Sequence, residues 1–232
     1  MSPGLLDDVV AWFRDGDHWH GAGGVPTLLG QHALLTLVST LAALVVALPL
    51  TIWLGHRRRG GTFAVNLSNI GRAIPIVALL SLLALGVFGT AAFGPFGRSG
   101  LATLVTLALF ALPPIVTNTY TGITEVDRDV VEAARGMGMS ELRVLREVEL
   151  PLALPLVVAG IRLAVVQVWA TATIAALVAG PGLGRIIVHG YESFQTAEVV
   201  AGSLIVAAVA LALELMFGVV QKLVDPRPAG SR

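Results

Sequence analysis

The residues whose types and spacing could do chemistry form a polar island between apolar stretches. Residues 132–134 read Glu-Ala-Ala, Gly138 follows, and Leu150-Pro151 closes the stretch. Acidic and basic residues crowd positions 125–149, whereas the sequence on either side is nearly free of charge. Two short amphipathic helices on the wet face of a membrane protein would form a docking surface. The chemistry predicted for this island is therefore non-covalent binding to a partner.

Two short helices are expected within residues 124–151. Asp129, followed three residues later by Glu132, has the form of an N-terminal cap with its reciprocal partner. Residues 136–138 (Gly-Met-Gly) would supply a turn, because glycine reaches backbone conformations that other residues avoid. Ser140 would cap the second helix, with Leu142, Leu145 and Val148 on one face. Leu150-Pro151 would end that helix and begin the next element, since proline is tolerated at a helix start but not inside one.

The small side chains of the island would let a partner surface approach the backbone closely. The alternative is a solvated loop of mixed charge. The predicted docking residues are Glu132, Ala133, Ala134, Gly136, Gly138, Met139 and Leu142.

Composition excludes several classes of protein. Of the 232 residues, 55% are hydrophobic and 13% are charged, whereas soluble domains carry about 25% charged residues. The mean hydropathy is +0.82. The absence of cysteine excludes disulfides and thiolate metal sites. A net charge of zero provides no basic field for nucleic acid. We therefore expect an all-α, polytopic membrane protein.

Five membrane spans are expected from length and hydropathy, at residues 32–55, 63–89, 100–121, 152–179 and 198–223. Residues 31–225 would form the transmembrane domain, with a tail at 226–232. Residues 1–30 would be extracytoplasmic and lack the pattern of a cleaved signal peptide. Within them, Leu5 to Phe13 is amphipathic and predicts an interfacial helix; a poorly ordered terminus is the alternative.

The distribution of basic residues predicts the orientation. One side of the five-span arrangement carries ten of the fifteen Lys and Arg residues, and the other side carries three. Basic residues favour the cytoplasmic side. The N-terminus is therefore expected outside, and the C-terminus and the polar island in the cytoplasm.

Prolines should break several spans. Pro75 lies inside the second, Pro113-Pro114 should interrupt the third, and Pro155 lies early in the fourth. Proline is tolerated in membrane helices where neighbours or a water-lined cavity satisfy the freed backbone groups. Kinked helices around a pathway fit this pattern, and so does an ordinary bundle with kinks.

Three ionisable residues, Arg72, Arg162 and Glu214, fall inside the expected spans. Arg162 and Glu214 each lie about ten residues from the cytoplasmic end, or about 15 Å deep. Intramembrane charges normally pair or face water. We expect Arg162 and Glu214 to pair with each other, or one of them with Arg72 or a neighbour, and so to hold the helices during gating. Shifted boundaries with snorkelling side chains are the alternative.

Polar groups within apolar spans are the candidates for a pathway. Each could equally serve helix–helix hydrogen bonding. The candidates are Asn118, Tyr120, Gln167, Trp169, Thr171 and Thr173.

The sequence gives little support for catalysis or for metal binding. His18-x-His20 supplies two ligands without a third, which makes a weak metal site. The loop at residues 180–184 (Gly-Pro-Gly-Leu-Gly) follows a membrane span rather than a strand, which argues against nucleotide binding. The chain has no G-x-x-x-x-G-K-[ST] sequence with which to cradle ATP phosphates.

The island resembles the EAA loop of bacterial ABC importer permeases, which rests in a cleft of the ATPase subunit. The chain as a whole resembles the permease subunits of glycine betaine/carnitine/choline importers over roughly residues 35–225. Pro181 departs from the pattern, where a small residue would be expected, and would stiffen its loop. The segments that carry the resemblance are Arg72-Ala73-Ile74-Pro75 and residues 118–123, 126–127, 132–139, 150–155, 159–162, 171–177 and 180–184.

This resemblance implies a type I ABC importer permease fold in a bacterial cell membrane. The implied complex has two permease subunits, identical or related, two ATPase subunits and an extracytoplasmic substrate-binding protein. ATP and Mg²⁺ would be bound by the ATPase, so this chain would hold no cofactor and would not be an enzyme. The implied substrate is an osmoprotectant quaternary amine. Such cations are usually held in aromatic cages, and with 6% scattered aromatics recognition is expected in the binding protein.

Two other functions remain open. The chain could serve an importer of methionine or another amino-acid-like solute. A different class altogether would be an ATP-independent channel or carrier, or a membrane scaffold.

Overall fold

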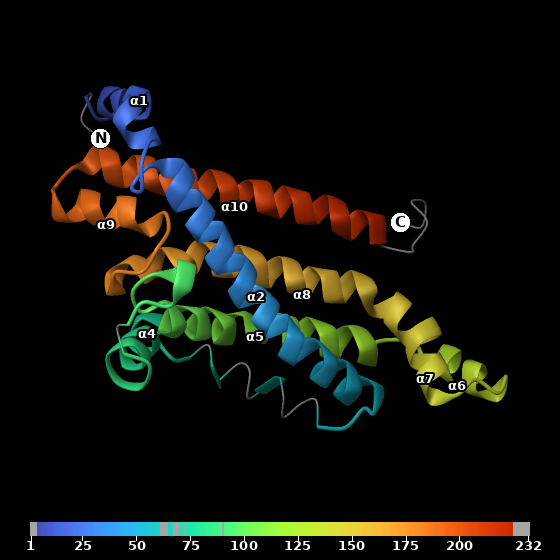
Figure 1. The fold of residues 1–232 in the computed structure, drawn as a ribbon. Helices are drawn as coiled ribbons and strands as arrows, with labels where there is room; N and C mark the ends of the chain where they lie inside the picture. Colours follow the sequence, from blue (N-terminus) through green and yellow to red (C-terminus); the bar gives the residue numbers. More distant parts are fainter. Residues whose placement is uncertain (1–3, 61–64, 67–69, 72, 90, 225–232) are drawn as a thin grey trace.

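Long helices that lie alongside one another make up most of the molecule. The computed structural model describes residues 4–60, 65–66, 70–71, 73–89 and 91–224. The four longest helices are α2 (Val25–His56), α5 (Gly100–Thr124), α8 (Leu150–Thr171) and α10 (Thr196–Val224). Helix α5 packs against both α2 and α8, and α10 packs against α8 (Figure 1). Within the described residues the only extended pairing is an isolated bridge between Ala92 and Arg98.

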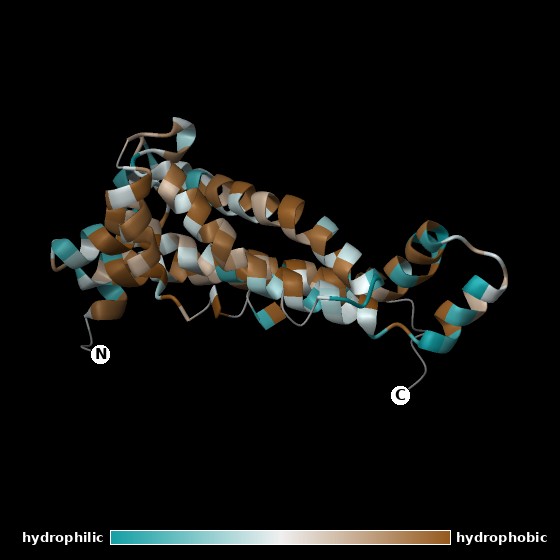
Figure 2. Ribbon diagram, turned by 90° about the horizontal axis from the view of Figure 1, so that it is seen from below, coloured by the Kyte–Doolittle hydropathy of each residue, from teal (hydrophilic) through white to brown (hydrophobic). Residues whose placement is uncertain are grey.

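Among the described residues, four helical stretches are long and apolar enough to cross a membrane: Val25–His56, Gly100–Thr124, Glu141–Val178 and Thr196–Val224. Even the shortest, with 25 residues, spans about 38 Å, and the hydrocarbon core of a bilayer is about 30 Å thick. Apolar residues run along these helices, and polar residues gather mainly at the ends of the bundle (Figure 2). These stretches confirm the first, third, fourth and fifth expected spans, although the first begins at residue 25 rather than 32.

The second span expected at residues 63–89 is broken at Pro75, as predicted, but within the described residues its helix is too short to cross a membrane, so that part of the prediction is wrong. In this region α4 (Ile76–Leu82) has seven residues, and a π-helical turn (Leu83–Val87) adds five. Together they reach only about 18 Å. Pro75 stands directly before α4 with extended backbone angles (φ −59°, ψ 123°), and its ring prevents the helix from continuing toward the N-terminus. Residues 61–64, 67–69 and 72 lie outside the described part of the chain.

The expected interruption at Pro113-Pro114 is also wrong, because α5 continues through both prolines. Pro114 has no N–H to donate to the carbonyl of Phe110, which would otherwise be left without its helical partner. The side chain of Gln167 in α8 donates to this carbonyl, with an Nε2–O distance of 3.3 Å. A neighbouring helix therefore supplies the hydrogen bond that the proline removes.

A helical hairpin closes one end of the bundle, here called the α6 end. It consists of α6 (Arg128–Gly136), α7 (Glu141–Val144) and a π-helical turn (Leu145–Glu149) that leads into α8. The expected helix break at Leu150-Pro151 is absent, because Glu149 and Leu150 keep helical backbone angles. Pro151 sits in the first turn of α8, where its missing N–H costs little.

The opposite end, here called the α9 end, carries α1 (Leu5–Arg14) and α9 (Gly184–Glu192). Helical 3₁₀ turns at Gly16–Trp19, Gly94–Phe96 and Ala172–Val178 complete it. The amphipathic helix predicted near the N-terminus is confirmed. Its buried residues Val9 and Trp12 belong to the face that packs on α10.

Candidate coupling surface and polar groups of the bundle

The α6–α7 hairpin has a small apolar interior of its own. Val126, Val131, Ala134 and Val144 form a buried cluster, and Met139 packs partly against it. Helix α6 is capped by Asp127, whose carboxylate accepts a hydrogen bond from the N–H of Asp129 at 2.9 Å. The cap predicted at Asp129 is therefore wrong by two residues, because Asp127 has the non-helical backbone that an N-cap requires.

The turn after α6 depends on Gly138. Its φ of +85° lies in the region that favours glycine. The N–H groups of Met137, Gly138 and Met139 bond back to the carbonyls of Ala133, Arg135 and Ala134 at 2.9–3.2 Å, which satisfies the last carbonyls of the helix. The predicted turn is confirmed.

The predicted docking residues divide between two faces. Glu132, Ala133, Gly136 and Gly138 are exposed and Leu142 is 55% exposed, whereas Met139 is half-buried and Ala134 is buried. Ala134 therefore packs the interior of the hairpin instead of meeting a partner. Sequence reasoning missed Val130 and Met137, which are exposed apolar residues. Helical periodicity could have found them, since residues 130, 133 and 137 share a face of α6.

An ion pair joins α6 to α7. The guanidinium of Arg135 donates two hydrogen bonds of 2.9 Å to the carboxylate of Glu141. The hydrogen bonds from Arg135 hold the pKa of Glu141 below its usual range, and the same bonds raise the pKa of Arg135. Glu141 therefore carries its negative charge over the whole physiological range.

His56, at the end of α2, contacts the hairpin through both ring nitrogens. Its Nδ1 lies 2.5 Å from Oε2 of Glu149, and its Nε2 lies 3.4 Å from Oε2 of Glu141. The Glu149 side chain is 1% exposed and that of His56 is 13% exposed. Nearby, Arg58 donates to the carbonyl of Val126 at 3.1 Å. Sequence reasoning assigned no role to His56, because 93 residues separate it from Glu149 and no local pattern relates them.

The expected pair between Arg162 and Glu214 is present. Arg162 in α8 donates to the carboxylate of Glu214 in α10, and its second terminal nitrogen donates to Oε1 of Gln221 at 3.0 Å. Arg72, the other predicted partner, lies outside the described residues. The ion pair therefore joins the last two long helices within their apolar length.

The predicted pathway residues mostly complete hydrogen bonds of the bundle. Asn118 donates to the carbonyl of Pro114 at 2.9 Å, Thr171 to that of Gln167 at 2.6 Å, and Thr173 to that of Ala170 at 2.8 Å. The side chain of Gln167 donates to the carbonyl of Phe110, as described above. Tyr120 is half-buried.

Trp169 is not exposed to any pathway in this structure. It is 2% exposed, and its indole N–H donates to the carbonyl of Val206 in α10 at 3.0 Å. Its ring lies 4.4 Å from that of His32, centroid to centroid. Its placement as a pathway residue is corrected to one of packing between α2, α8 and α10.

His32 is a buried polar residue to which the sequence assigned no role. It is 0% exposed; its Nε2 lies 2.9 Å from the carbonyl of Trp169, and its Nδ1 accepts from the N–H of Leu183 at 3.3 Å. One donor and one acceptor describe the neutral ring with its proton on Nε2. Through these contacts His32, which lies in α2, holds the loop before α9 against α2 and α8.

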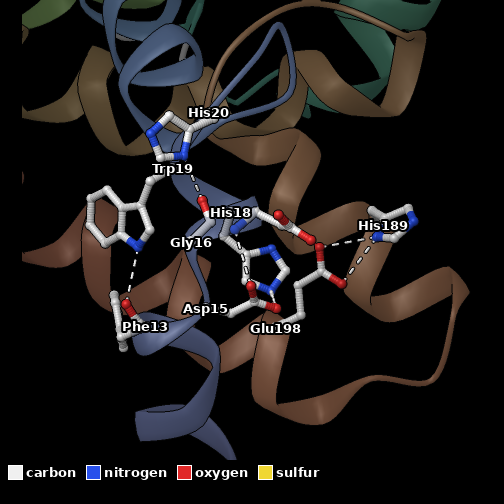
Figure 3. Close-up of polar contacts among 9 residues, drawn as sticks. Phe13, Asp15, Gly16, His18, Trp19, His20, His189 and Glu198 are labelled. Carbon is white, nitrogen blue, oxygen red and sulfur yellow. Dashed lines mark hydrogen bonds and ion pairs between the residues drawn. The ribbon is translucent and has the colours of Figure 1, made fainter.

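The α9 end has an open hollow of about 570 Å³ between the loop at residues 94–98 and α9. Arg98, Arg185, His189 and Glu192 contribute charge or polarity to its wall. Beside it, Nδ1 of His189 lies 3.0 Å from both carboxylate oxygens of Glu198 (Figure 3).

The two histidines near the N-terminus make separate local contacts. The ring of His18 stacks on that of Trp12. His18 also lies 3.7 Å from the carboxylate of Asp15, while Nδ1 of His20 lies 2.7 Å from the carbonyl of Gly16 (Figure 3). Within the part of the chain that the structure describes, no group of three or more His, Asp or Glu side chains could hold a metal ion.

The described residues form a helical bundle with four stretches that are long and apolar enough to cross a membrane and with a polar helical hairpin at one end, which is the architecture of a multi-pass membrane protein. Residues 36–230 match the family described as the binding-protein-dependent transport system inner membrane component. The chain belongs to this family and is a component of the bacterial cell membrane.

Curated relatives match over most of their length. The carnitine transport permease protein OpuCD of Listeria monocytogenes serotype 1/2a (strain 10403S) is 34% identical over 197 residues, which covers 84% of each chain. The choline transport system permease protein OpuBD of Bacillus subtilis (strain 168) is 34% identical over 198 residues, covering 85% of this chain and 84% of the relative. The osmoprotectant import permease protein OsmW of Salmonella typhimurium (strain LT2) is 30% identical over 206 residues, covering 89% and 94%.

Solved structures share the fold. A chain of the MetNI methionine ABC transporter, in an inward-facing conformation, aligns with a TM-score of 0.69 at 20% identity, covering 97% of this chain and 99% of that one. A chain from an amino acid ABC transporter with histidines aligns with a TM-score of 0.65 at 17% identity, covering 98% and 100%. The predicted fold class is confirmed.

Proposed function

We propose that this chain is the permease subunit of an ATP-driven importer that translocates osmoprotectants of the glycine betaine, carnitine and choline type. The observation that carries the proposal is 30–34% identity, over at least 84% of this chain, to relatives named for carnitine, choline and osmoprotectant transport. Import of methionine or another amino-acid-like solute is the lesser candidate, because the methionine and amino acid transporters found among solved structures are 17–21% identical to this chain.

The α6–α7 hairpin is the proposed docking site of a separate ATPase subunit. Val130, Met137 and Leu142 expose apolar side chains beside Glu132, and Ala133 leaves the backbone of α6 accessible. Apolar groups rimmed by charge suit a protein interface. The permease would move with the ATPase, which would bind ATP and Mg²⁺, and would carry out no covalent chemistry itself.

The basic residues support an orientation in which the α6 end is cytoplasmic and the α9 end is extracytoplasmic. The hollow at the α9 end would then face the substrate-binding protein. A second permease subunit, identical or related, would complete the pathway. Asn118, Tyr120, Gln167, Thr171 and Thr173 remain the proposed pathway residues.

The experiment is capture and uptake in one preparation. The tagged chain is co-expressed with candidate ATPase and binding-protein subunits, purified and reconstituted, and labelled glycine betaine, carnitine, choline and methionine are offered in turn. We expect ATP-dependent uptake of a quaternary amine. Glu132→Arg/Gly138→Asp should abolish ATPase capture, whereas the control Asp8→Arg reverses an exposed charge on α1 and should not.

Uptake of methionine alone would overturn the proposed substrate class. Failure to capture any ATPase, with the chain inserted and folded, would favour a carrier or a scaffold.

A further inference from the structure

We propose that His56 is a positioning residue that ties the α6–α7 hairpin to the end of α2. The hairpin is joined covalently to α5 and α8 only. A link through His56 would also carry its movement to the first long span. The coupling part of this inference rests on the proposed function; the physical link does not.

The contact involves a buried carboxylate that needs a partner. Glu149 is 1% exposed, and a carboxylate taken out of water is costly unless a charged or hydrogen-bonding partner faces it. That partner is the imidazole of His56, 2.5 Å away. Removal of the ring would leave the carboxylate of Glu149 without this contact.

The position of the contact suits a hinge. Glu141 opens α7, and Glu149 is the last residue of the π-helical turn before α8. Isolated π-helical turns inside helices are frequent at functional sites. One imidazole therefore holds both ends of the segment in which the hairpin changes into a membrane span. Gly55 allows the end of α2 to lie close to α5, because a Cβ at this position would lie 2.9 Å from the side chain of Ile123 in α5.

Charged groups on the hairpin and next to His56 in the sequence surround the ring. Glu141 and Glu149 face it from the hairpin, and Arg135 engages Glu141 from α6. Arg57 and Arg58 are its neighbours in sequence, of which Arg57 lies over the ring of Trp53 and Arg58 bonds to the carbonyl of Val126. Glu132 on α6 lies close enough to act on Arg135 electrostatically.

The first test measures the link in the chain alone. Because the chain has no cysteine, spin labels can be placed uniquely at the exposed positions Arg59→Cys and Met137→Cys. We expect double electron–electron resonance to give a narrow distance distribution when His56 is present. His56→Leu has no group that could donate to Glu149 and should give a broader one.

The matched control is His18→Leu, because His18 is a histidine paired with a carboxylate at the opposite end. It should reproduce the wild-type distribution. If His56→Leu keeps the wild-type distribution, the inference is wrong. Glu149→Gln removes the buried charge with little change in volume and tests the same link from its other side. It should also broaden the distribution.

The second test measures coupling in the complex with its ATPase. We expect the number of substrate molecules transported per ATP hydrolysed to be about three- to tenfold lower in His56→Leu than in the wild type, the scale of one hydrogen bond. His18→Leu should keep the wild-type ratio. A transporting complex whose His56→Leu variant keeps the wild-type ratio would overturn the coupling role. A wild-type chain that captures no ATPase would instead overturn the proposed function, and the distance measurement would still decide the link.

Discussion

The two ends of the bundle use the same pair of side chains in different ways. At the α6 end, His56 and Glu149 are 93 residues apart, and their side chains are 13% and 1% exposed. At the α9 end, His189 and Glu198 are nine residues apart on consecutive helices, and their side chains are 67% and 11% exposed. The first pair joins elements that are distant in the sequence, at a place from which water is largely excluded. The second pair joins consecutive helices beside solvent, where an ion pair contributes little to the free energy of folding.

The ends also differ in what else holds them together. At the α9 end, backbone segments approach so closely that side chains are excluded: a Cβ on Gly184 would lie 2.1 Å from the carbonyl oxygen of Thr173, and one on Gly182 would lie 2.9 Å from His32. At the α6 end, charged groups such as Arg135 and Glu141 make the connections. Ionic contacts can be released and remade by charge, pH or a partner, whereas close backbone packing cannot. The α6 end is therefore the end whose contacts can change with charge, pH or a partner.

The largest effect should come from filling the closest approach at the α9 end. Gly184→Ala would force apart the segments that carry Gly184 and Thr173, at a cost of more than about 3 kcal/mol, or about 10 °C in the melting midpoint. Thermal unfolding of the purified protein in detergent would measure it. Gly136→Ala is the matched control, because nothing lies within 4 Å of a Cβ there. Equal midpoints for the two variants would refute the packing difference between the ends.

A smaller effect is expected from the ion pair inside the apolar length of the bundle. Of the two partners of Arg162 described above, Glu214→Ala removes the carboxylate and leaves Gln221. This substitution should lower the melting midpoint by about 5 °C. The double variant Arg162→Leu/Glu214→Leu should recover part of this loss, because it leaves no unpaired charge. A double variant less stable than Glu214→Ala would contradict this account.

Next in size is the turn of the hairpin. Gly138 has a φ of +85°, and an L-residue with a Cβ pays about 1–2 kcal/mol to adopt a left-handed conformation. Gly138→Ala should therefore lower the melting midpoint by about 3–5 °C, and Gly138→Asn by less, because asparagine tolerates this region better. The same thermal assay compares them. Equal losses for the two variants would mean that the backbone conformation is not the cause.

The smallest effect should come from the exposed pair of the hairpin. The pKa of Glu141 is lowered by Arg135 in the folded protein, so the pair stabilises the hairpin above the ordinary range of a glutamate. That contribution is lost as the pH falls through the lowered pKa. Arg135→Ala should cost about 1 °C or less at pH 7 and nothing at about pH 3.

The control for this last measurement is Arg143→Ala, which breaks the neighbouring exposed pair with Glu147. A difference between Arg135→Ala and wild type that persists at pH 3 would show that Arg135 acts by packing and not by charge.

Patterns that are local in the sequence predicted much of the fold. Hydropathy over about 20 residues identified four spans, because each long helix must be apolar to lie in a bilayer. The turn at Gly138 followed from glycine alone. The same local reasoning failed at Asp129, since Asp127 is an equally good cap two residues earlier, and the choice depends on where the chain leaves α5.

The remaining errors involve contacts between distant segments. Pro113-Pro114 looked like a break, because nothing near it in the sequence says that Gln167 reaches the Phe110 carbonyl. The second span was expected to cross the membrane with a break at Pro75, but the described helix after Pro75 is too short to do so. Ala134 was expected to face a partner, but it packs against the interior of its own hairpin.

By itself, the sequence determined the class of protein, the positions of four long helices and the polar hairpin, and it made Arg162 and Glu214 candidate partners. Each of these follows from the free energy of placing a particular side chain or run of side chains in lipid or in water, which depends little on the rest of the fold. Only the tertiary structure decided which face of α6 is exposed, that His32 pins the loop before α9, and that His56 meets Glu149. Those contacts depend on the relative placement of helices, which no local spacing encodes.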